Sequence, residues 1–197
     1  HWITYSQMTV NRQSKRSKRG RKVAKTSRKP ISAHVERRLW AESAGKCMNP
    51  DCRADLFISN GDIAERAHIV PYCESAENTF DNLILICPNC HTNFDKNSAF
   101  TADEVREWKS IRHAEIDRVF GKTFSSFDDL RKEAAPLLAR NKSIYENYYM
   151  KDKRRLWDVF EKEIIVNNRK LCTMFESNLC LFQNHKDNSF SNQAAVR

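Results

Sequence analysis

The chain has 197 residues, of which 40% are hydrophobic and 30% are charged, and its formal net charge is +9. This composition is ordinary for a soluble globular protein, and no run approaches the roughly 20 apolar residues that span a bilayer, so a membrane-spanning helix is not expected. The first ten residues have neither the charged leader nor the apolar core of a secretory signal, which favours a cytoplasmic location.

The positive charge is concentrated near the N-terminus. Residues 12–29 contain ten basic residues, and no acid occurs before Glu36. The rest of the chain is nearly neutral, with 34 − 10 = 24 Lys and Arg against 25 Asp and Glu. Such a run repels itself, which predicts a disordered basic arm over residues 1–30 that binds nucleic acid, with nuclear targeting and a solubilising arm as alternatives. The candidate nucleic-acid-binding residues are Arg16, Lys18, Arg19, Arg21 and Lys22.

A helix is predicted over residues 31–46, after the arm. Ser32 can cap it, and Val35 and Leu39 begin an apolar face at a spacing of four residues. Gly45 provides the expected end of this helix.

Two cysteine pairs follow the predicted helix, one with C-x4-C spacing and one with C-x2-C spacing: Cys47, Cys52, Cys87 and Cys90. Tetrahedral zinc takes four thiolates, and Asn-Pro-Asp and Pro-Asn are the turns expected in zinc knuckles. A segment of about fifty residues also buries little apolar surface, so a structural zinc ion is expected to stabilise it. The alternatives are a coincidental pairing and a redox dithiol. The other cysteines are expected to be ordinary thiols, with the last two buried: Cys73, Cys172 and Cys180.

Two short strands are predicted between the cysteine pairs, over residues 63–70 and 82–87. If these strands pair and a helix begins after Cys90, then His68, Asn82 and His91 can face one groove. A structural zinc clip alone would not require these three polar residues.

The rest of the chain is predicted to be helical. Thr101 and Glu104 form a capping box, a second helix covers residues 127–138, and a third covers residues 153–181. This pattern predicts a helical extension over residues 121–183 and a flexible tail over residues 184–197. The third helix carries an apolar stripe, expected to lie in the core or in a homodimer contact: Leu156, Phe160, Ile164, Leu171, Phe175 and Leu179.

Residues 35–97 resemble the HNH endonucleases, or ββα-metal nucleases, in the branch that has two cysteine knuckles. The resemblance rests on AHIVP at 67–71, DNLILICPNCH at 81–91 and the following FD at 94–95, and it covers about a third of the chain. It implies an α+β fold: a small zinc-stapled, treble-clef-like ββα-metal nuclease domain over residues 31–120. A helical N-terminal flank and an all-α C-terminal extension complete the predicted architecture.

The resemblance also implies an endodeoxyribonuclease, with DNA as partner and a divalent ion on the scissile phosphate. His68 is similar to the general base, His91 to a ligand of the catalytic ion, and Asn82 to the asparagine that fixes the loop and orients the base. The implied catalytic ion is magnesium, or manganese or nickel, and it is separate from the structural zinc.

One position departs from the family pattern. Many members have an aspartate ligand directly before the base histidine, and Ala67 stands there in this chain. Glu65 is the alternative carboxylate ligand, with Asp81 and Asp95 as weaker candidates.

The biological role follows only from fold-level analogy, which favours a prokaryotic restriction or anti-phage effector with a sensor or ATPase partner. The main alternative is a non-catalytic zinc module that binds DNA or RNA, and a zinc-stapled interaction scaffold is a third interpretation.

Overall fold

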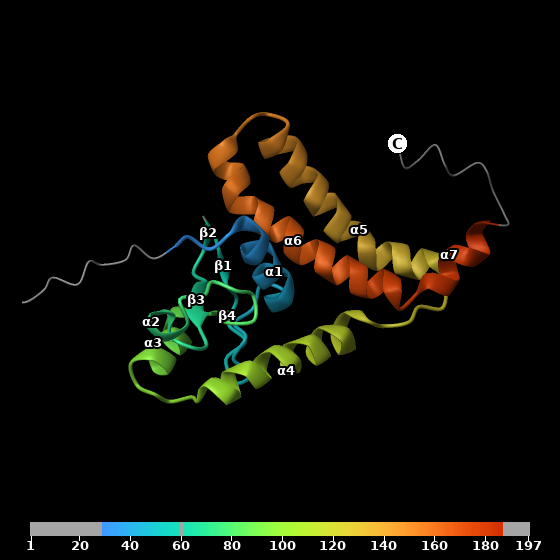
Figure 1. The fold of residues 1–197 in the computed structure, drawn as a ribbon. Helices are drawn as coiled ribbons and strands as arrows, with labels where there is room; N and C mark the ends of the chain where they lie inside the picture. Colours follow the sequence, from blue (N-terminus) through green and yellow to red (C-terminus); the bar gives the residue numbers. More distant parts are fainter. Residues whose placement is uncertain (1–28, 60, 187–197) are drawn as a thin grey trace, which may run out of the picture.

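The computed structural model describes residues 29–59 and 61–186, which form a small mixed body packed against long helices (Figure 1). The five candidate arm residues, Arg16 to Lys22, lie outside the described residues. The elements are α1 (Ala33–Ser43), β1 (Phe57–Ile58), β2 (Gly61–Asp62), β3 (Glu65–His68), α2 (Tyr72–Ser75), β4 (Leu83–Ile86), α3 (Pro88–Asp95), α4 (Ala102–Phe120), α5 (Phe127–Ile144), η1 (Tyr145–Tyr149), α6 (Arg154–Glu176) and α7 (Leu179–Lys186).

The two predicted strands are confirmed, and they pair antiparallel as β3 and β4. Glu65 lies opposite Ile86, and His68 lies opposite Leu83. All four residues of β4 are buried, which explains why its sequence is apolar throughout rather than alternating. The hairpin β1–β2 forms a second small sheet that was not predicted from the sequence.

The helix after β4 begins earlier than predicted, at Pro88 rather than after Cys90. Cys87 is the N-cap residue, and Pro88 occupies the first helical position, where its fixed φ favours the helix and its missing N–H costs nothing. The strand, the knuckle and the helix therefore follow one another without a linker, which completes the ββα unit.

Helix α1 confirms the first predicted helix, with Ser32 Oγ accepting from the Val35 N–H at 3.3 Å. The helix ends at Ala44 and Gly45, both with positive φ. A Cβ at Gly45 would lie 2.8 Å from the Phe57 ring, so glycine is required here by both conformation and space.

The main core joins the ββα unit to the helices around it. Trp40 of α1, Leu83 and Ile86 of β4, Ile116 of α4 and Val166 of α6 all belong to one buried cluster. Helix α6 packs against α1, α4 and α5, and Figure 1 shows it crossing between α1 and α5. The C-terminal helices therefore contribute directly to the packing of the predicted nuclease core.

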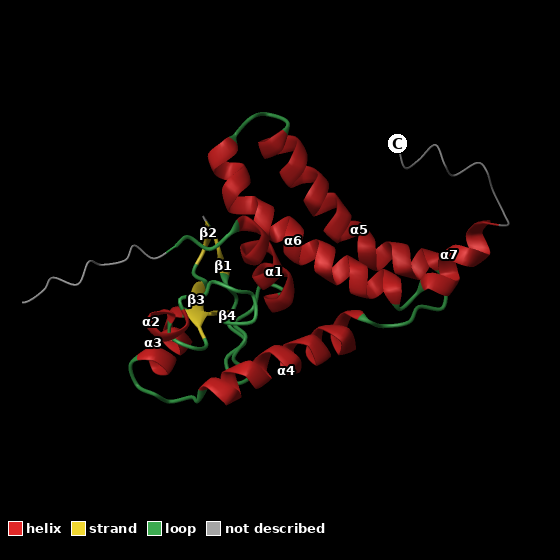
Figure 2. Ribbon diagram, in the orientation of Figure 1, coloured by secondary structure: helices red, strands yellow, loops and turns green. Residues whose placement is uncertain are grey.

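The C-terminal helices differ from the prediction in their ends (Figure 2). The capping box of Thr101 and Glu104 is confirmed, whereas α5 runs to Ile144, six residues beyond the predicted end. The predicted last helix is two helices, because the buried Asn178 side chain donates to the carbonyls of Lys122 and Met174 at 2.7 and 2.8 Å. This interruption between α6 and α7 ties their junction to the segment that follows α4.

The apolar stripe of the last predicted helix is only partly buried. Leu171 lies in a second buried cluster with Leu130 and Met174, whereas Leu156 is 41% and Leu179 57% exposed. None of the helices in residues 29–59 and 61–186 combines the length and the hydropathy of a membrane-spanning segment.

The prediction that the two C-terminal thiols are buried is wrong. Cys172 and Cys180 are both exposed, because the helix turns other residues of α6 and α7 toward the core. Cys73 is exposed as well.

Candidate active site and metal centre

The four paired cysteines converge on one point, as predicted. Their Sγ atoms all lie within 4.8 Å of one another, and the Sγ atoms of Cys52 and Cys87 are 3.8 Å apart. Four sulfurs bound at about 2.3 Å to a tetrahedral zinc ion are separated by about 3.8 Å, so the arrangement fits that ion. In the part of the chain that the structure describes, this is the one group of three or more His, Cys, Asp or Glu side chains close enough together to hold a metal ion.

Backbone and side-chain donors hold the sulfurs in place. The Cys87 N–H donates to Cys47 Sγ at 3.3 Å, and Asn49 Nδ2 donates to Cys90 Sγ at 3.4 Å. Asn49 also forms the first knuckle itself, because its Oδ1 accepts from the Asp51 N–H at 2.9 Å. These contacts supply the outer hydrogen bonds that commonly orient metal ligands.

The electrostatics of the cluster also fit a dication. Burial raises the pKa of Cys47 to about 11 and raises that of Cys90. Burial would also raise the pKa of Cys87, but hydrogen bonds from Cys90 and from the other thiols outweigh it, and the net direction is downward. Neighbouring thiolates repel one another, so a central Zn²⁺ would allow all four to be deprotonated.

His68 is the last residue of β3, and its ring is held from two sides. Its Nε2 lies 2.9 Å from Asn78 Oδ1, and the Tyr72 ring packs edge-on against it with a centroid distance of 5.4 Å. Asn78 was not singled out from the sequence. No motif marks this position, and its role becomes visible only when the segment between β3 and β4 is folded.

Asn82 fixes that segment. Its Oδ1 accepts from the Val70 N–H at 2.8 Å, and its Nδ2 donates to the Val70 carbonyl at 3.0 Å and to Ser75 Oγ at 3.1 Å. The side chain thus continues the β3–β4 pairing and anchors the chain leading to α2. Asn82 contacts the loop, and the contact to the His68 ring comes from Asn78 instead.

His91 lies in the first turns of α3, with a carboxylate near each ring nitrogen. Nε2 lies 2.9 Å from Asp95 Oδ2, and Nδ1 lies 3.8 Å from Glu65 Oε2. Asp95 is one helical turn after His91, so it can hold the Nε2 proton and leave Nδ1 for a metal beside Glu65.

The other acidic candidates are arranged differently. Ala67 is fully buried, so the position that carries aspartate in many HNH endonucleases belongs to the core in this chain. Asp81 is exposed, and its charge acts on Lys109 of α4.

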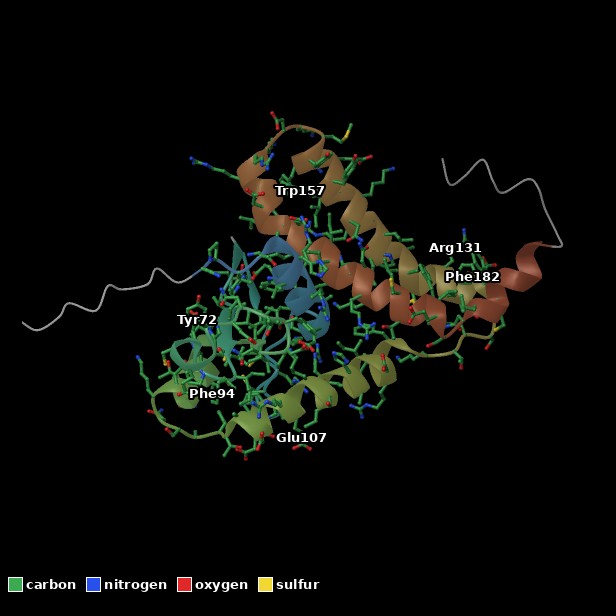
Figure 3. All side chains as sticks on the ribbon, in the orientation of Figure 1. Tyr72, Phe94, Glu107, Arg131, Trp157 and Phe182 are labelled. Atoms are coloured by element: carbon green, nitrogen blue, oxygen red, sulfur yellow. The ribbon has the colours of Figure 1, made fainter. Side chains whose placement is uncertain are left out.

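Both histidines line one cavity of about 460 Å³. Other lining residues come from β3, α2 and α3 and include Arg66, Tyr72, Phe94 and Asp95. Figure 3 shows Tyr72 and Phe94 at the same end of the molecule, where α2 and α3 lie. A cavity of about 550 Å³ beside η1 is lined by neither histidine nor cysteine, so it offers no imidazole base.

Residues 47–96 match the family model described as HNH endonuclease, which confirms the resemblance for that segment. The match covers about a quarter of the chain and contains all four cysteines together with His68, Asn82 and His91. No curated protein matches the chain.

Proposed function

We propose that this protein is a metal-dependent endonuclease that hydrolyses phosphodiester bonds in DNA, because residues 47–96 match the HNH endonuclease family model. The observation that carries the proposal is the single cavity shared by His68 and His91. Each imidazole has its Nε2 within 2.9 Å of a neighbouring side-chain oxygen. In each ring Nδ1 is therefore the nitrogen available to accept a proton or to bind a metal ion.

His68 is the general base in this proposal. A phosphodiester is an anion that repels nucleophiles, so its hydrolysis requires a base that deprotonates water. Neutral imidazole, with an ordinary pKa of about 6.5, carries out this step at neutral pH. Asn82 acts on His68 indirectly, because its hydrogen bonds to Val70 fix the main chain directly after β3.

His91 and Glu65 are the proposed ligands of a catalytic Mg²⁺, Mn²⁺ or Ni²⁺. When bound, the ion neutralises charge that develops on the phosphate and on the leaving oxygen. Asp95 holds the far side of the His91 ring and so orients the imidazole toward Glu65. A zinc ion at the four cysteines would be separate from this ion and would hold the start of α3, which Cys87 caps and Cys90 belongs to.

The activity is tested with purified zinc-loaded protein and supercoiled plasmid DNA. Nicked or linear product is expected with Mg²⁺, Mn²⁺ or Ni²⁺ and not with a chelator weak enough to leave the structural zinc bound. Intact plasmid under all these conditions, together with tight DNA binding, would favour the alternative of a non-catalytic zinc-binding nucleic-acid module. That module would not require His68 and His91 to share a cavity, which is why catalysis is favoured here.

Replacing Glu65 by glutamine is expected to raise the metal concentration for half-maximal cleavage by about 10- to 100-fold, because the ligand no longer carries a negative charge. The measurement is the initial cleavage rate as a function of Mn²⁺ concentration. Glu107→Gln is the matched control, because Glu107 is exposed on α4 (labelled in Figure 3) and does not line the cavity. An unchanged metal dependence in Glu65→Gln would assign the second ligand elsewhere.

Deleting residues 1–28 is expected to weaken binding to DNA of any sequence and to flatten its salt dependence. Neutralising phosphates releases counterions, so the log–log slope on duplex DNA decreases by about 0.9 for each phosphate that the protein no longer neutralises. The measurement is the Kd for two unrelated duplexes across a range of salt concentrations. A truncated protein with the original salt slope would show that the arm does not bind the DNA backbone.

The wider biological assignments are part of the same proposal and rest on analogy with the family. They are a restriction or anti-phage role in the prokaryotic cytoplasm, a sensor or ATPase partner, and a homodimer through the C-terminal helices. The exposed Leu156 and Leu179 are available for such a dimer. Light scattering that shows a strict monomer at working concentration would contradict the dimer.

The division of the chain into domains is also a proposal. It comprises an arm over residues 1–30, a nuclease domain over 31–120, a helical extension over 121–183 and a tail over 184–197.

A further inference from the structure

We propose that Asn78 is a positioning residue that sets the tautomer of His68, and that the main chain of Lys29, at the base of the basic arm, sets the orientation of Asn78. The inference rests on the proposed role of His68 as general base. It gives the arm a second function, because its attachment point then determines which ring nitrogen of His68 is free to accept a proton.

The orientation of the Asn78 amide follows from its two contacts. Its Nδ2 lies 2.6 Å from the Lys29 carbonyl oxygen, and its Oδ1 lies 2.9 Å from His68 Nε2. A carbonyl oxygen accepts hydrogen bonds and cannot donate, so the NH₂ group must face Lys29. The carbonyl of the Asn78 amide must then face His68.

The tautomer of neutral His68 follows from that orientation. The Asn78 oxygen only accepts, so His68 Nε2 carries the proton and donates it. Nδ1 then keeps its lone pair, which can accept a proton from water. If the amide turned over, its NH₂ group would face Nε2, the ring proton would move to Nδ1, and the base would be blocked.

Lys29 is held at this place by contacts on both sides. Its N–H donates to the Tyr72 hydroxyl at 3.2 Å, and the Tyr72 ring packs against His68. Two residues later, Ile31 packs against the main core. In Figure 1 the blue segment before α1 lies on the same side of the molecule as α2 and α3. The Lys29 carbonyl is thus fixed beside the cavity by interactions distant in sequence.

The arm and the base are therefore linked through one amide. The last of the five candidate DNA-binding residues, Lys22, precedes Lys29 by seven positions along the chain. Lys29, the last basic residue of the arm, is thereby part of the assembly of the site, whereas residues 1–28 act only as an electrostatic tether.

Two truncations separate these roles. Deleting residues 1–28 removes most of the basic arm and keeps the Lys29 carbonyl, whereas deleting residues 1–30 removes that carbonyl and keeps Ile31 and the Ser32 cap. At saturating DNA, kcat is expected to be at least about tenfold lower in the second truncation, a part of the 10²- to 10⁴-fold that a general base contributes. Equal kcat values in the two truncations would overturn the link to Lys29.

Asn78→Asp provides a rescue test. A carboxylate has two acceptor oxygens and no donor, so it accepts the Nε2 proton of His68 in either orientation and gains nothing from the Lys29 carbonyl, which is itself an acceptor. In this background the truncation of residues 1–30 is expected to have a kcat no lower than about half that of the truncation of residues 1–28. The control is Asn147→Asp, on η1, which should leave the difference between the truncations intact. A full difference in Asn78→Asp would show that Lys29 acts by another route.

The tautomer can also be measured without any cleavage. Side-chain ¹⁵N NMR of the zinc-loaded protein, with the His68 signals assigned by comparison with His68→Gln, distinguishes a protonated Nε2 from a protonated Nδ1. Deletion of residues 1–28 is expected to leave Nε2 protonated, and deletion of residues 1–30 to shift the ring toward protonated Nδ1 or a mixture. The same tautomer in both proteins would overturn the inference. Because this readout does not depend on catalysis, a protein that fails to cut DNA would contradict the proposed function alone.

Discussion

His68→Ala is expected to lower the rate of DNA cleavage at saturating DNA by about 10²- to 10⁴-fold, the contribution of a general base. The reduction should appear in kcat, because the imidazole acts on the water that attacks the phosphate. His68 is half-buried at the end of β3, and its side chain contacts Asn78 and Tyr72 beside the cavity. The fully buried residues of β3 and β4 are unchanged in this variant, so the fold is expected to persist.

The measurement combines single-turnover cleavage with three checks of integrity. Circular dichroism, zinc content and the Kd for DNA are each expected to match the original protein. His34→Ala is the matched control, because His34 is exposed on α1 and lines neither of the two cavities described above. Cleavage by His68→Ala at the rate of that control would remove His68 from the mechanism.

Cys87→Ser is expected to release zinc and to unfold the ββα unit. Structural zinc sites have apparent binding free energies of about 10–16 kcal/mol, which equals or exceeds the total stability of about 5–15 kcal/mol of an ordinary domain. Cys87 is also the N-cap residue of α3, and its Sγ lies 3.8 Å from that of Cys52. Removing this ligand therefore removes the support of both the knuckles and the helix that carries His91.

The corresponding measurements are zinc content by elemental analysis and thermal unfolding by circular dichroism. Cys172→Ser is the control, because this thiol is exposed and lies outside the four-cysteine cluster. Native protein that contains no zinc, or a Cys87→Ser variant that keeps both its zinc and its Tm, would contradict a structural zinc site.

Zinc release should also depend on pH. The metal-free cluster holds protons, since burial raises the pKa of Cys47 and Cys90. Zinc must displace these protons to bind, so lowering the pH favours the protonated thiols and weakens zinc affinity. The expected result is a zinc dissociation constant that increases as the pH is lowered, measured by competition with a chromophoric chelator.

Features that depend on neighbouring residues could be predicted from the sequence by itself. The Ser32 cap, the capping box of Thr101 and Glu104, and the apolar run of β4 are each confirmed, because hydrogen bonds and burial of this kind act within a few residues. The cysteine spacing likewise predicted the metal cluster, because two tight turns with two cysteines each supply the four thiolates of a structural zinc site.

Helix ends were predicted less well where a distant residue decides them. Asn178 ends α6 through a hydrogen bond to Lys122, which lies 56 positions away in the chain. The exposure of Cys172 and Leu179 depends in the same way on which face of each helix meets its neighbours. A helical pattern indicates periodicity, but it does not indicate what covers each face.

The partners of the two histidines were decided only by the tertiary structure. Glu65 lies near His91 because β3 packs against α3. Asn78 meets both His68 and Lys29 because the loop from β3 to β4 contacts the segment that precedes α1. Asn78 and Lys29 are 49 positions apart, and neither belongs to a motif. Such contacts are selected by the packing of whole elements, so no local preference in the sequence indicates them.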